Sequence, residues 1–473
     1  MTQTMRKRLK WIILLAIILA AGTLLTLAIL TTVENNGTLF REGLISSNTM
    51  ILFIVLILLI PVLLILLLLV LVFSKDKPQE IVANIESIGN TVPSAPEASE
   101  KTEEPKEEEE TVTQRFCMLT DIESKKDTYG HGTYSKNLTL KELCEEFRNY
   151  AATDEKTHLY YDISDIRRFI AGLSLSHIII LQGMSGTGKT SLATVFGRYI
   201  DNESTVIPVQ PMWKERTDLV GYYNEFTRKF NETKLLEKMY EASYSDDMYI
   251  TVLDEMNIAR VEYYFAEFLS LLELPDPEAR YIDIVSDKWD TDPKLLKDGR
   301  LKLPINMWFI GTANNDDSTF AISDKVYDRA MILNLDAKSE PFVAPKPEKR
   351  PISYEQFQAL VDEAIAEYKI SRRNMKRLEA LDKYLIEHFH ITFGNRIMKQ
   401  IKSYIPVFVS CGGEELDALD DILSKKVIRK LETQNPIYLR NAAEGLIEYI
   451  NELFGSDKMP LCKEYIHRLE RNA

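Results

Sequence analysis

Residues 176–190 read S-H-I-I-I-L-Q-G-M-S-G-T-G-K-T, and this stretch decides the fold of the chain. An aliphatic run breaks abruptly into a glycine-rich turn with the spacing G-x-x-x-x-G-K-[ST] from Gly183 to Thr190. Glycines let the backbone turn tightly and direct its N–H groups at phosphate oxygens. The segment therefore predicts a phosphate-binding loop at the end of a strand.

The side chains that close the turn extend this prediction to a nucleoside triphosphate. Lys189 is placed to reach the terminal phosphates, and the Thr190 hydroxyl is placed to ligate Mg²⁺. The next residues, S-L-A-T-V-F-G-R-Y-I, are compatible with a helix, whose N-terminus favours anions. The residues of this segment that we predict to bind the nucleotide are Gly183, Ser185, Gly186, Thr187, Gly188, Lys189 and Thr190.

A second apolar run ends in two carboxylates, in the segment Y-I-T-V-L-D-E from Tyr249 to Glu255. This is the Walker B pattern. We expect Asp254 to lie in the nucleotide-binding site and to hold Mg²⁺. We expect Glu255 to orient and deprotonate the attacking water. The alternative is a carboxylate pair that caps the next helix. The position of the pair after a P-loop favours the catalytic interpretation.

Two later segments and one in the carboxy-terminal region offer further catalytic groups. Asn314 ends the apolar run of N-M-W-F-I-G-T-A-N-N-D-D-S, at the sheet edge where a γ-phosphate would lie. Arg329, in S-D-K-V-Y-D-R-A, is a candidate arginine finger that stabilises developing phosphate charge. Arg396, in F-G-N-R-I-M-K-Q-I, is a candidate to meet the phosphates from the helical region. For both arginines the alternative is a surface salt bridge.

Strand and helix patterns alternate after the P-loop, which predicts an α/β fold: a parallel sheet with helices on both faces. Two helices are expected before the P-loop, at 139–151 and 164–173. A Pro-rich stretch from Pro341 to Pro351 then leads into a region that reads as entirely helical. The predicted strands are 205–209, 249–253, 307–311 and 331–335, and the predicted helices between them are 234–242 and 258–272.

The first residues predict a membrane hairpin. Trp11–Leu30 and Ile51–Phe73 are long apolar runs, each sufficient to cross a bilayer as a transmembrane helix. A cleaved signal peptide is the competing interpretation of the first run, but a second span follows. Basic residues flank both outer ends, so the positive-inside rule places both ends in the cytoplasm. We expect a two-pass protein of the cell membrane whose nucleotide-binding part is cytoplasmic.

A polar segment follows the hairpin. Residues 74–115 are rich in Pro, Ser and Glu and poor in large apolar groups, which predicts a disordered acidic linker. The formal net charge of the chain is −14, which disfavours nucleic acid as a partner. The predicted organisation is a membrane hairpin at 1–73, the linker at 74–115, a helical lead-in at 116–161, a nucleotide-binding core at 162–340 and a helical lid at 341–473.

The combination of these motifs carries a resemblance. The P-loop, the L-D-E-M-N Walker B segment, G-T-A-N-N-D-D-S and the later D-R together resemble the AAA+ superfamily, and within it the branch of McrB-type, MoxR-type and dynein-like ATPases. The resemblance covers about 162–336 and a helical lid. It implies a ring, often a hexamer, in which Arg329 of one subunit completes the site of its neighbour.

The same resemblance assigns further parts. It implies that Asn314 is the sensor 1 residue and Arg396 the sensor 2 residue. It also implies two inserted hairpins, one at 221–229 and one formed by 281–286 with 301–304. We therefore expect Mg²⁺-dependent hydrolysis of ATP, with GTP possible, that remodels a co-encoded protein partner. The alternatives are a McrB-like nucleic-acid motor of a defence system and a non-catalytic nucleotide switch that recruits partners at the membrane.

Overall fold

The computed structural model describes residues 114–314, 319–336 and 339–472, all of which belong to the unit Lys106–Ala473. The predicted spans at 11–30 and 51–73 and almost all of the predicted linker lie outside these residues. Across the described ranges, no helix is both long enough and apolar enough to cross a membrane.

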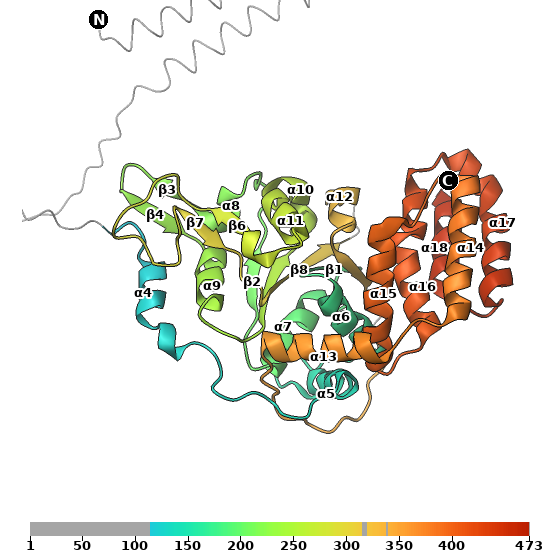
Figure 1. Cartoon of the computed structure of the whole chain (residues 1–473), viewed down its shortest axis with the longest axis horizontal. Helices are drawn as coiled ribbons and strands as arrows, with labels where there is room; N and C mark the ends of the chain where they lie inside the picture. The colour runs from blue at the N-terminus through green and yellow to red at the C-terminus, as the bar shows by residue number, and fades with distance from the viewer. Residues whose placement is uncertain (1–113, 315–318, 337–338, 473) are drawn as a thin grey trace, which may run out of the picture. The chain divides into compact units, whose positions relative to one another are not determined.

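A five-stranded parallel sheet forms the centre of the fold, in the order β2-β5-β8-β1-β9 (Figure 1). The predicted strands are confirmed, although β8 is longer than predicted. Their aliphatic runs follow from burial, because a parallel sheet is covered on both faces. The strands are β1 Ile178–Gly183, β2 Thr205–Pro208, β5 Tyr249–Asp254, β8 Met307–Asn314 and β9 Met331–Asn334.

Successive side chains of each strand enter two different cores, because they point to opposite faces of the sheet. Ile179 and Leu181 of β1 pack in the first core, and Ile178 and Ile180 pack in the second. The predicted helical cover of both faces is therefore confirmed. The first core includes α5 Leu140–Thr153, α6 Ile163–Leu175 and α7 Lys189–Tyr199, and the second includes α4 Met118–Ser124, α9 Lys234–Ala242, α10 Val261–Tyr264 and α11 Ala266–Glu273.

The segment after the Walker B carboxylates departs from the prediction of one helix over 258–272. It forms the 3-10 turn η2 Met256–Ile258 and the two short helices α10 and α11. Asn257, within the turn, donates from its Nδ2 to the carbonyl oxygens of Asn314 and Phe320, at 2.9 and 3.3 Å. These long-range bonds hold the segment against β8, and no local helix pattern reveals them.

Both predicted hairpins are present, and the first contacts the start of the described chain. The carboxylate of Glu232 accepts hydrogen bonds from the backbone N–H groups of Cys117, Met118 and Leu119, which satisfies the free donors at the start of α4. Hydrogen bonds thus join the start of α4 to the first hairpin. The hairpin strands are β3 Gly221–Asn224 with β4 Lys229–Glu232, and β6 Tyr281–Asp283 with β7 Arg300–Lys302.

Arg115 corrects the predicted linker boundary. The sequence places it at the end of the disordered linker, yet it is 1% exposed. Its guanidinium forms ion pairs with Asp292 at 2.6 Å and with Asp287 at 3.0 Å, and it lies over the ring of Trp289. A buried cation keeps its charge when such partners replace water. Distant acidic residues therefore hold Arg115 within the folded core that follows it.

The carboxy-terminal region is helical, as predicted, and it packs on the core. Asp421 has a fully buried side chain that accepts from the Tyr404 hydroxyl at 2.7 Å and pairs with Lys425 and with Arg168 of α6. The lid thus shares a buried charge network with the core. Its helices are α13 Tyr354–Glu367, α14 Arg372–Phe389, α15 Gly394–Ser410, α16 Glu415–Lys426, η4 Ile428–Thr433, α17 Pro436–Phe454 and α18 Pro460–Asn472.

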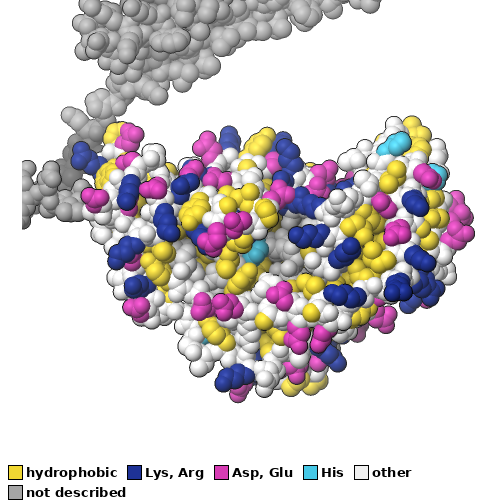
Figure 2. Space-filling view, viewed as in Figure 1, with side chains coloured by type: hydrophobic (Ala, Val, Ile, Leu, Met, Phe, Trp, Pro, Cys, Tyr) yellow, Lys and Arg dark blue, Asp and Glu magenta, His cyan; other side chains and the backbone are white. Residues whose placement is uncertain are grey.

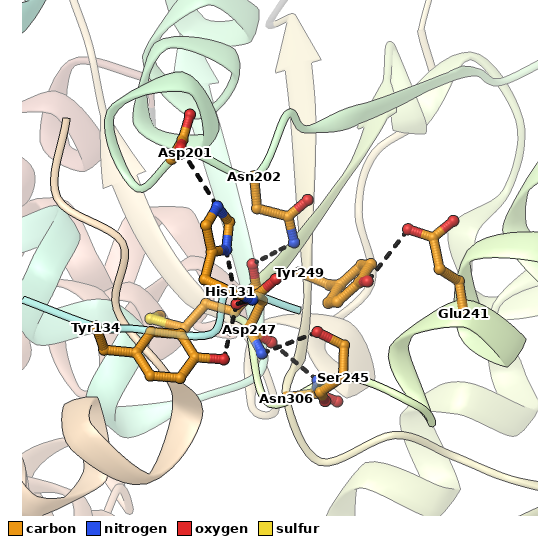
Figure 3. A network of polar contacts seen from close by, with 10 residues as sticks. His131, Tyr134, Asp201, Asn202, Glu241, Ser245, Asp247, Tyr249 and Asn306 are labelled. Atoms are coloured by element: carbon orange, nitrogen blue, oxygen red, sulfur yellow. Dashed lines mark hydrogen bonds and ion pairs between the residues drawn. The ribbon is translucent and has the colours of Figure 1, made fainter. Parts of the chain in front are cut away.

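A polar network fastens the lead-in segment to the sheet (Figure 3). His131 lies between two carboxylates, with Nδ1 2.9 Å from Asp247 and Nε2 3.3 Å from Asp201. The Tyr134 hydroxyl donates to the same Asp247 oxygen at 2.9 Å. Burial by itself lowers the pKa of His131, but the contacts with the two carboxylates outweigh burial and raise its pKa above the ordinary 6.5.

The substitution His131→Gln should therefore lower the melting temperature more in acid than in base. A raised folded pKa stabilises the fold fully below the ordinary value, and this contribution is lost as the pH rises through the folded value. We expect a larger loss at about pH 5.5 than at about pH 8.5. His388→Gln, at an exposed position, is the matched control. Equal losses for His131→Gln at both pH values would contradict the assignment.

Candidate functional site

The phosphate-binding loop has the backbone geometry that its glycines predict. Gly183, Gly186 and Gly188 all have positive φ angles, of 146°, 80° and 89°. A Cβ on Gly183 would lie 2.3 Å from the carbonyl oxygen of Leu335, just beyond β9, so no other residue fits there. The Tyr161 hydroxyl donates to the Gly188 carbonyl at 2.9 Å and so joins the loop to the segment before α6.

Lys189 begins α7 and turns back over the loop. Its Nζ donates to the carbonyl oxygens of Gly183 and Met184, at 3.0 and 2.7 Å. The side chain is 7% exposed. The ammonium group is therefore held at the mouth of the loop, within the ring of atoms that would surround a phosphate.

The strand order brings the Walker B carboxylate to the P-loop. β8 lies between β1 and β5, and all three strands are parallel, so their carboxyl ends meet at one edge. There the Thr190 hydroxyl donates to Asp254 Oδ1 at 2.7 Å. Mg²⁺ prefers a small number of hard oxygen ligands together with substrate phosphates and waters. A hydroxyl and a carboxylate in contact beside a phosphate loop fit this ion.

Thr312 is a site residue that the sequence did not reveal. It lies on β8, is 3% exposed, and donates from Oγ1 to Asp254 Oδ1 at 2.8 Å. The same Oγ1 accepts from the backbone N–H of Glu255 at 2.9 Å. One hydroxyl thus orients both Walker B residues. Nothing marks this threonine in a strand pattern, because its role depends on the register of β8 against β5.

Glu255 has a strained backbone. Its φ and ψ are 53° and 45°, in the left-handed region that residues other than glycine rarely adopt. Such strain costs about 1–3 kcal/mol and persists where surrounding contacts hold it, often at active sites. The bond to Thr312 is one such contact. The conformation ends β5 at Asp254, so that Glu255 leads into the turn η2.

Asn314 reaches the same edge. It is the last residue of β8 and pairs in register with Gly183, the first glycine of the loop. Its carbonyl accepts from Asn257 Nδ2 and from the Thr319 hydroxyl, at 2.9 and 3.0 Å. Asn314 therefore lies beside the P-loop as predicted. Residues 315–318, which follow it, lie outside the described residues.

The lid covers part of this edge. A cavity of about 670 Å³ lies over the carboxyl ends of β1, β8 and β9, and Asn314 is among its lining residues. Three of its lining residues are cationic side chains of the lid, and no sequence motif marks them because isolated basic residues are common in amphipathic helices. These lid residues are Lys425, Arg429 and Arg468.

The two candidate arginines lie at the other end of the strands. The Arg329 carbonyl accepts from the hydroxyl of Ser176, which precedes β1, whereas the P-loop follows β1. The length of β1 separates these points by roughly 20 Å. Arg329 and Arg396 bind the same carboxylate, each at 2.5 Å from Glu273. Together with Arg280 and Lys399 they line a cavity of about 450 Å³.

Arg396 does not lie near the P-loop of its own chain, where the sequence predicted it. The sequence offers it as a group that meets the phosphates from the lid, yet the structure places it beside Arg329 and away from the P-loop of its own chain. The reason is the packing of α15 along α6, which directs the start of α15 to the amino ends of the strands. Lys425, Arg429 and Arg468 occupy the position over the P-loop edge instead.

A P-loop, a Walker B strand and a polar residue on the strand between them define the core as a nucleotide-binding α/β domain of the P-loop class. Residues 178–330 match the family described as "AAA domain (dynein-related subfamily)". This part of the chain is an AAA+ ATPase domain. Residues 346–473, which form the lid, match the family described as "Domain of unknown function (DUF8727)".

Other comparisons add little beyond this domain. No curated protein sequence matches the chain. Among solved structures 165 chains match. One is described as "Crystal structure analysis of a full-length MCM homolog from Methanopyrus kandleri", at 10% sequence identity and a TM-score of 0.34. The match covers 66% of this chain and 61% of that chain, so it spans less than two thirds of that protein.

Thr312 offers a test of the site geometry. The substitution Thr312→Val keeps the shape of the side chain but removes its hydrogen bonds to Asp254 and Glu255. We expect kcat for nucleotide hydrolysis to fall about tenfold to a hundredfold, with little change in nucleotide affinity, since each of the two lost bonds contributes about 1–1.5 kcal/mol. Thr312→Ser, which keeps the hydroxyl, should restore most of the rate. A steady-state assay that finds both variants equally slow would contradict the role of the hydroxyl.

Proposed function

We propose that this protein is a Mg²⁺-dependent nucleoside triphosphatase that works as a ring, in which each active site lies between two subunits. The single observation that carries the proposal is the distance between Arg329 and the P-loop of its own chain. A cation at the amino ends of the strands cannot reach a phosphate at their carboxyl ends. In a head-to-tail ring the same two edges face each other across every interface.

The roles of the residues follow from their positions. Lys189 and the loop N–H groups bind the phosphates, and Glu255 takes the proton of the attacking water. Asn314 is placed to orient that water or the γ-phosphate. Arg329 of the next subunit stabilises the charge that develops on the transferred group. Thr190 and Asp254 hold Mg²⁺, which neutralises phosphate charge when bound.

Arg396 belongs with Arg329 in this proposal. Both arginines bind Glu273, so in the proposed ring both would lie on the same interface surface. A bound γ-phosphate carries more charge than a single carboxylate, and guanidinium groups bind phosphate oxygens in a bidentate manner. We therefore assign Arg396 to the neighbour's site, and the cationic lid residues over the P-loop to the chain's own site.

The work of the cycle is assigned to a protein partner. Hydrolysis would change the contacts of the lid with the nucleotide, and we assign the resulting movement of the lid to work on a bound protein. Lys and Arg are interspersed with Asp and Glu over the face shown in Figure 2, and the net charge is −14, which favours a protein over a nucleic acid. The P-loop contacts phosphates and not the base, so ATP is proposed with GTP as the alternative.

Complementation between two inactive variants tests the shared site. Glu255→Gln should abolish turnover while nucleotide still binds, and Arg329→Ala should lower kcat by about a thousandfold. Mixed in equal amounts, the two should recover about a quarter of the wild-type rate, because one interface in four then combines an intact Glu255 with an intact Arg329. The measurement is a steady-state assay on the reassembled mixture.

The outcomes separate the candidate functions. Wild-type turnover by Glu255→Gln would overturn the catalytic assignment. No turnover by the wild-type chain at any concentration, with nucleotide bound, would support a non-catalytic switch instead. Active Arg329→Ala would show that the site does not depend on a neighbour.

Membrane anchoring is a separate part of the proposal, supported by the two apolar runs at 11–30 and 51–73. The full chain should stay with membranes after an alkaline wash, because helices that cross a bilayer are not extracted as surface proteins are. A variant that lacks residues 1–73 should be found in the supernatant. Release of the full chain by the wash would contradict the anchor.

A further inference from the structure

The short helix α12, Asp324–Tyr327, comes directly before Arg329 and has an unusual arrangement at its end. The last carbonyl groups of a helix have no partners within the helix. Here the Nζ of Lys426 donates to the carbonyl oxygens of Tyr327, Asp328 and Ala330. The bond to Tyr327 is 2.7 Å long. The Arg329 carbonyl accepts from the Ser176 hydroxyl at 2.8 Å. The backbone that carries Arg329 is thus held on every residue.

Lys426 belongs to the lid, where it ends α16. It is 3% exposed, and burial lowers its pKa to about 7. Burial of a lysine costs desolvation energy, which hydrogen bonds from its N–H groups offset. Both the charged and the neutral amine can donate to carbonyl oxygens. A cation at a helix C-terminus is also favoured by the helix dipole. Lys426 therefore joins the lid to the segment that carries Arg329 through buried hydrogen bonds.

A second lid residue holds the other end of α12. Arg429 donates from NH1 to Asp324 Oδ1 at 2.6 Å, and its guanidinium lies 4.3 Å from the centre of the Tyr327 ring. The Tyr327 hydroxyl in turn accepts from Gln182 Nε2 at 2.6 Å, next to the first glycine of the P-loop. The helix α12 is thus attached to the lid at both ends and to the strand that leads into the P-loop.

Residues 425–429 of the lid contact both the cavity at the P-loop edge and the backbone around Arg329. Lys425 and Arg429 line the cavity over the chain's own P-loop edge, whereas Lys426, between them in sequence, binds the backbone around Arg329. A nucleotide in the cavity would act directly on this segment of α16 and η4. Any displacement of the segment reaches α12 through bonds that are already formed, without a loop in between.

We propose that Lys426 is a positioning residue that couples the nucleotide state of one subunit to Arg329, and so to hydrolysis in the next subunit. This inference rests on the proposed function. When the lid lies on the core, Lys426 holds α12 so that Arg329 points at the neighbour's phosphate. When the lid moves with its own nucleotide, α12 moves with it and the neighbour loses the arginine. Lys426 itself touches no substrate.

The substitution Lys426→Met on the full chain tests the coupling. Methionine fills the space of the lysine stem but donates no hydrogen bond. We expect kcat to fall about tenfold while KM for ATP stays within about twofold, because the variant's own binding residues are intact. Lys402→Met, the same change at an exposed position of the lid, should leave both constants unchanged. Wild-type kcat in folded Lys426→Met would overturn the proposal.

Mixing experiments distinguish coupling from simple damage. A Lys426→Met subunit has a working Glu255 but a displaced Arg329, so Glu255→Gln subunits should rescue it. The mixture should then turn over faster than either variant alone, to about the extent of the Arg329→Ala and Glu255→Gln mixture. If the Arg329→Ala mixture recovers activity and the Lys426→Met mixture does not, the coupling is wrong. If neither recovers, the shared site itself is wrong.

A second variant keeps the test valid if Lys426→Met does not fold. Asp324→Asn removes the charge that binds Arg429, and the Asp324 side chain is 57% exposed, so the core is untouched. We expect a smaller loss of kcat, about threefold, and mixing with an equal amount of Glu255→Gln subunits should about double the rate per subunit that has an intact Glu255. An unchanged rate in Asp324→Asn, or a loss that mixing does not rescue, would count against α12 as the connecting element.

Discussion

The structure depends on one hydroxyl between two strands. Thr312 of β8 binds the carboxylate of Asp254 and the backbone of Glu255, while Asp254 also accepts from Thr190 of the P-loop helix. This contact exists because β8 lies between β1 and β5 and runs parallel to both. A shift of β8 by one residue would turn Thr312 to the other face of the sheet and separate the two Walker motifs. Register, more than any single side chain, assembles the site.

The lid extends this arrangement across the whole domain. Its buried Asp421 pairs with Arg168 of the core, and its helices share the first hydrophobic core with one face of the sheet. The segment of α16 and η4 can therefore face the P-loop edge and the Arg329 backbone at once. In a ring, these two surfaces would belong to successive active sites. The proposed communication between subunits uses packing that the fold already needs for stability.

Much of the fold and part of the site followed from local patterns. The P-loop spacing, the carboxylates after an apolar run and the alternation of strands and helices each arise from neighbours in sequence, and the structure contains the corresponding elements. The prediction of one helix over 258–272 is wrong, and Arg396 lies beside Arg329, away from the P-loop of its own chain. Arg396 follows the packing of α15 on α6, and the predicted helix begins late, after the turn in which Asn257 binds β8, and is divided at Phe265. Neither contact has a local signal.

The sequence by itself determined that this chain has a P-loop, a Walker B strand and a helical region after them, because glycine spacing and apolar periodicity act over a few residues. The tertiary structure decided which residues meet. It placed Asn314 beside Gly183, gave Thr312 its two partners, buried Arg115, and set Arg329 at the edge opposite its own P-loop. Those outcomes depend on strand order, register and lid packing, which join residues far apart in the chain.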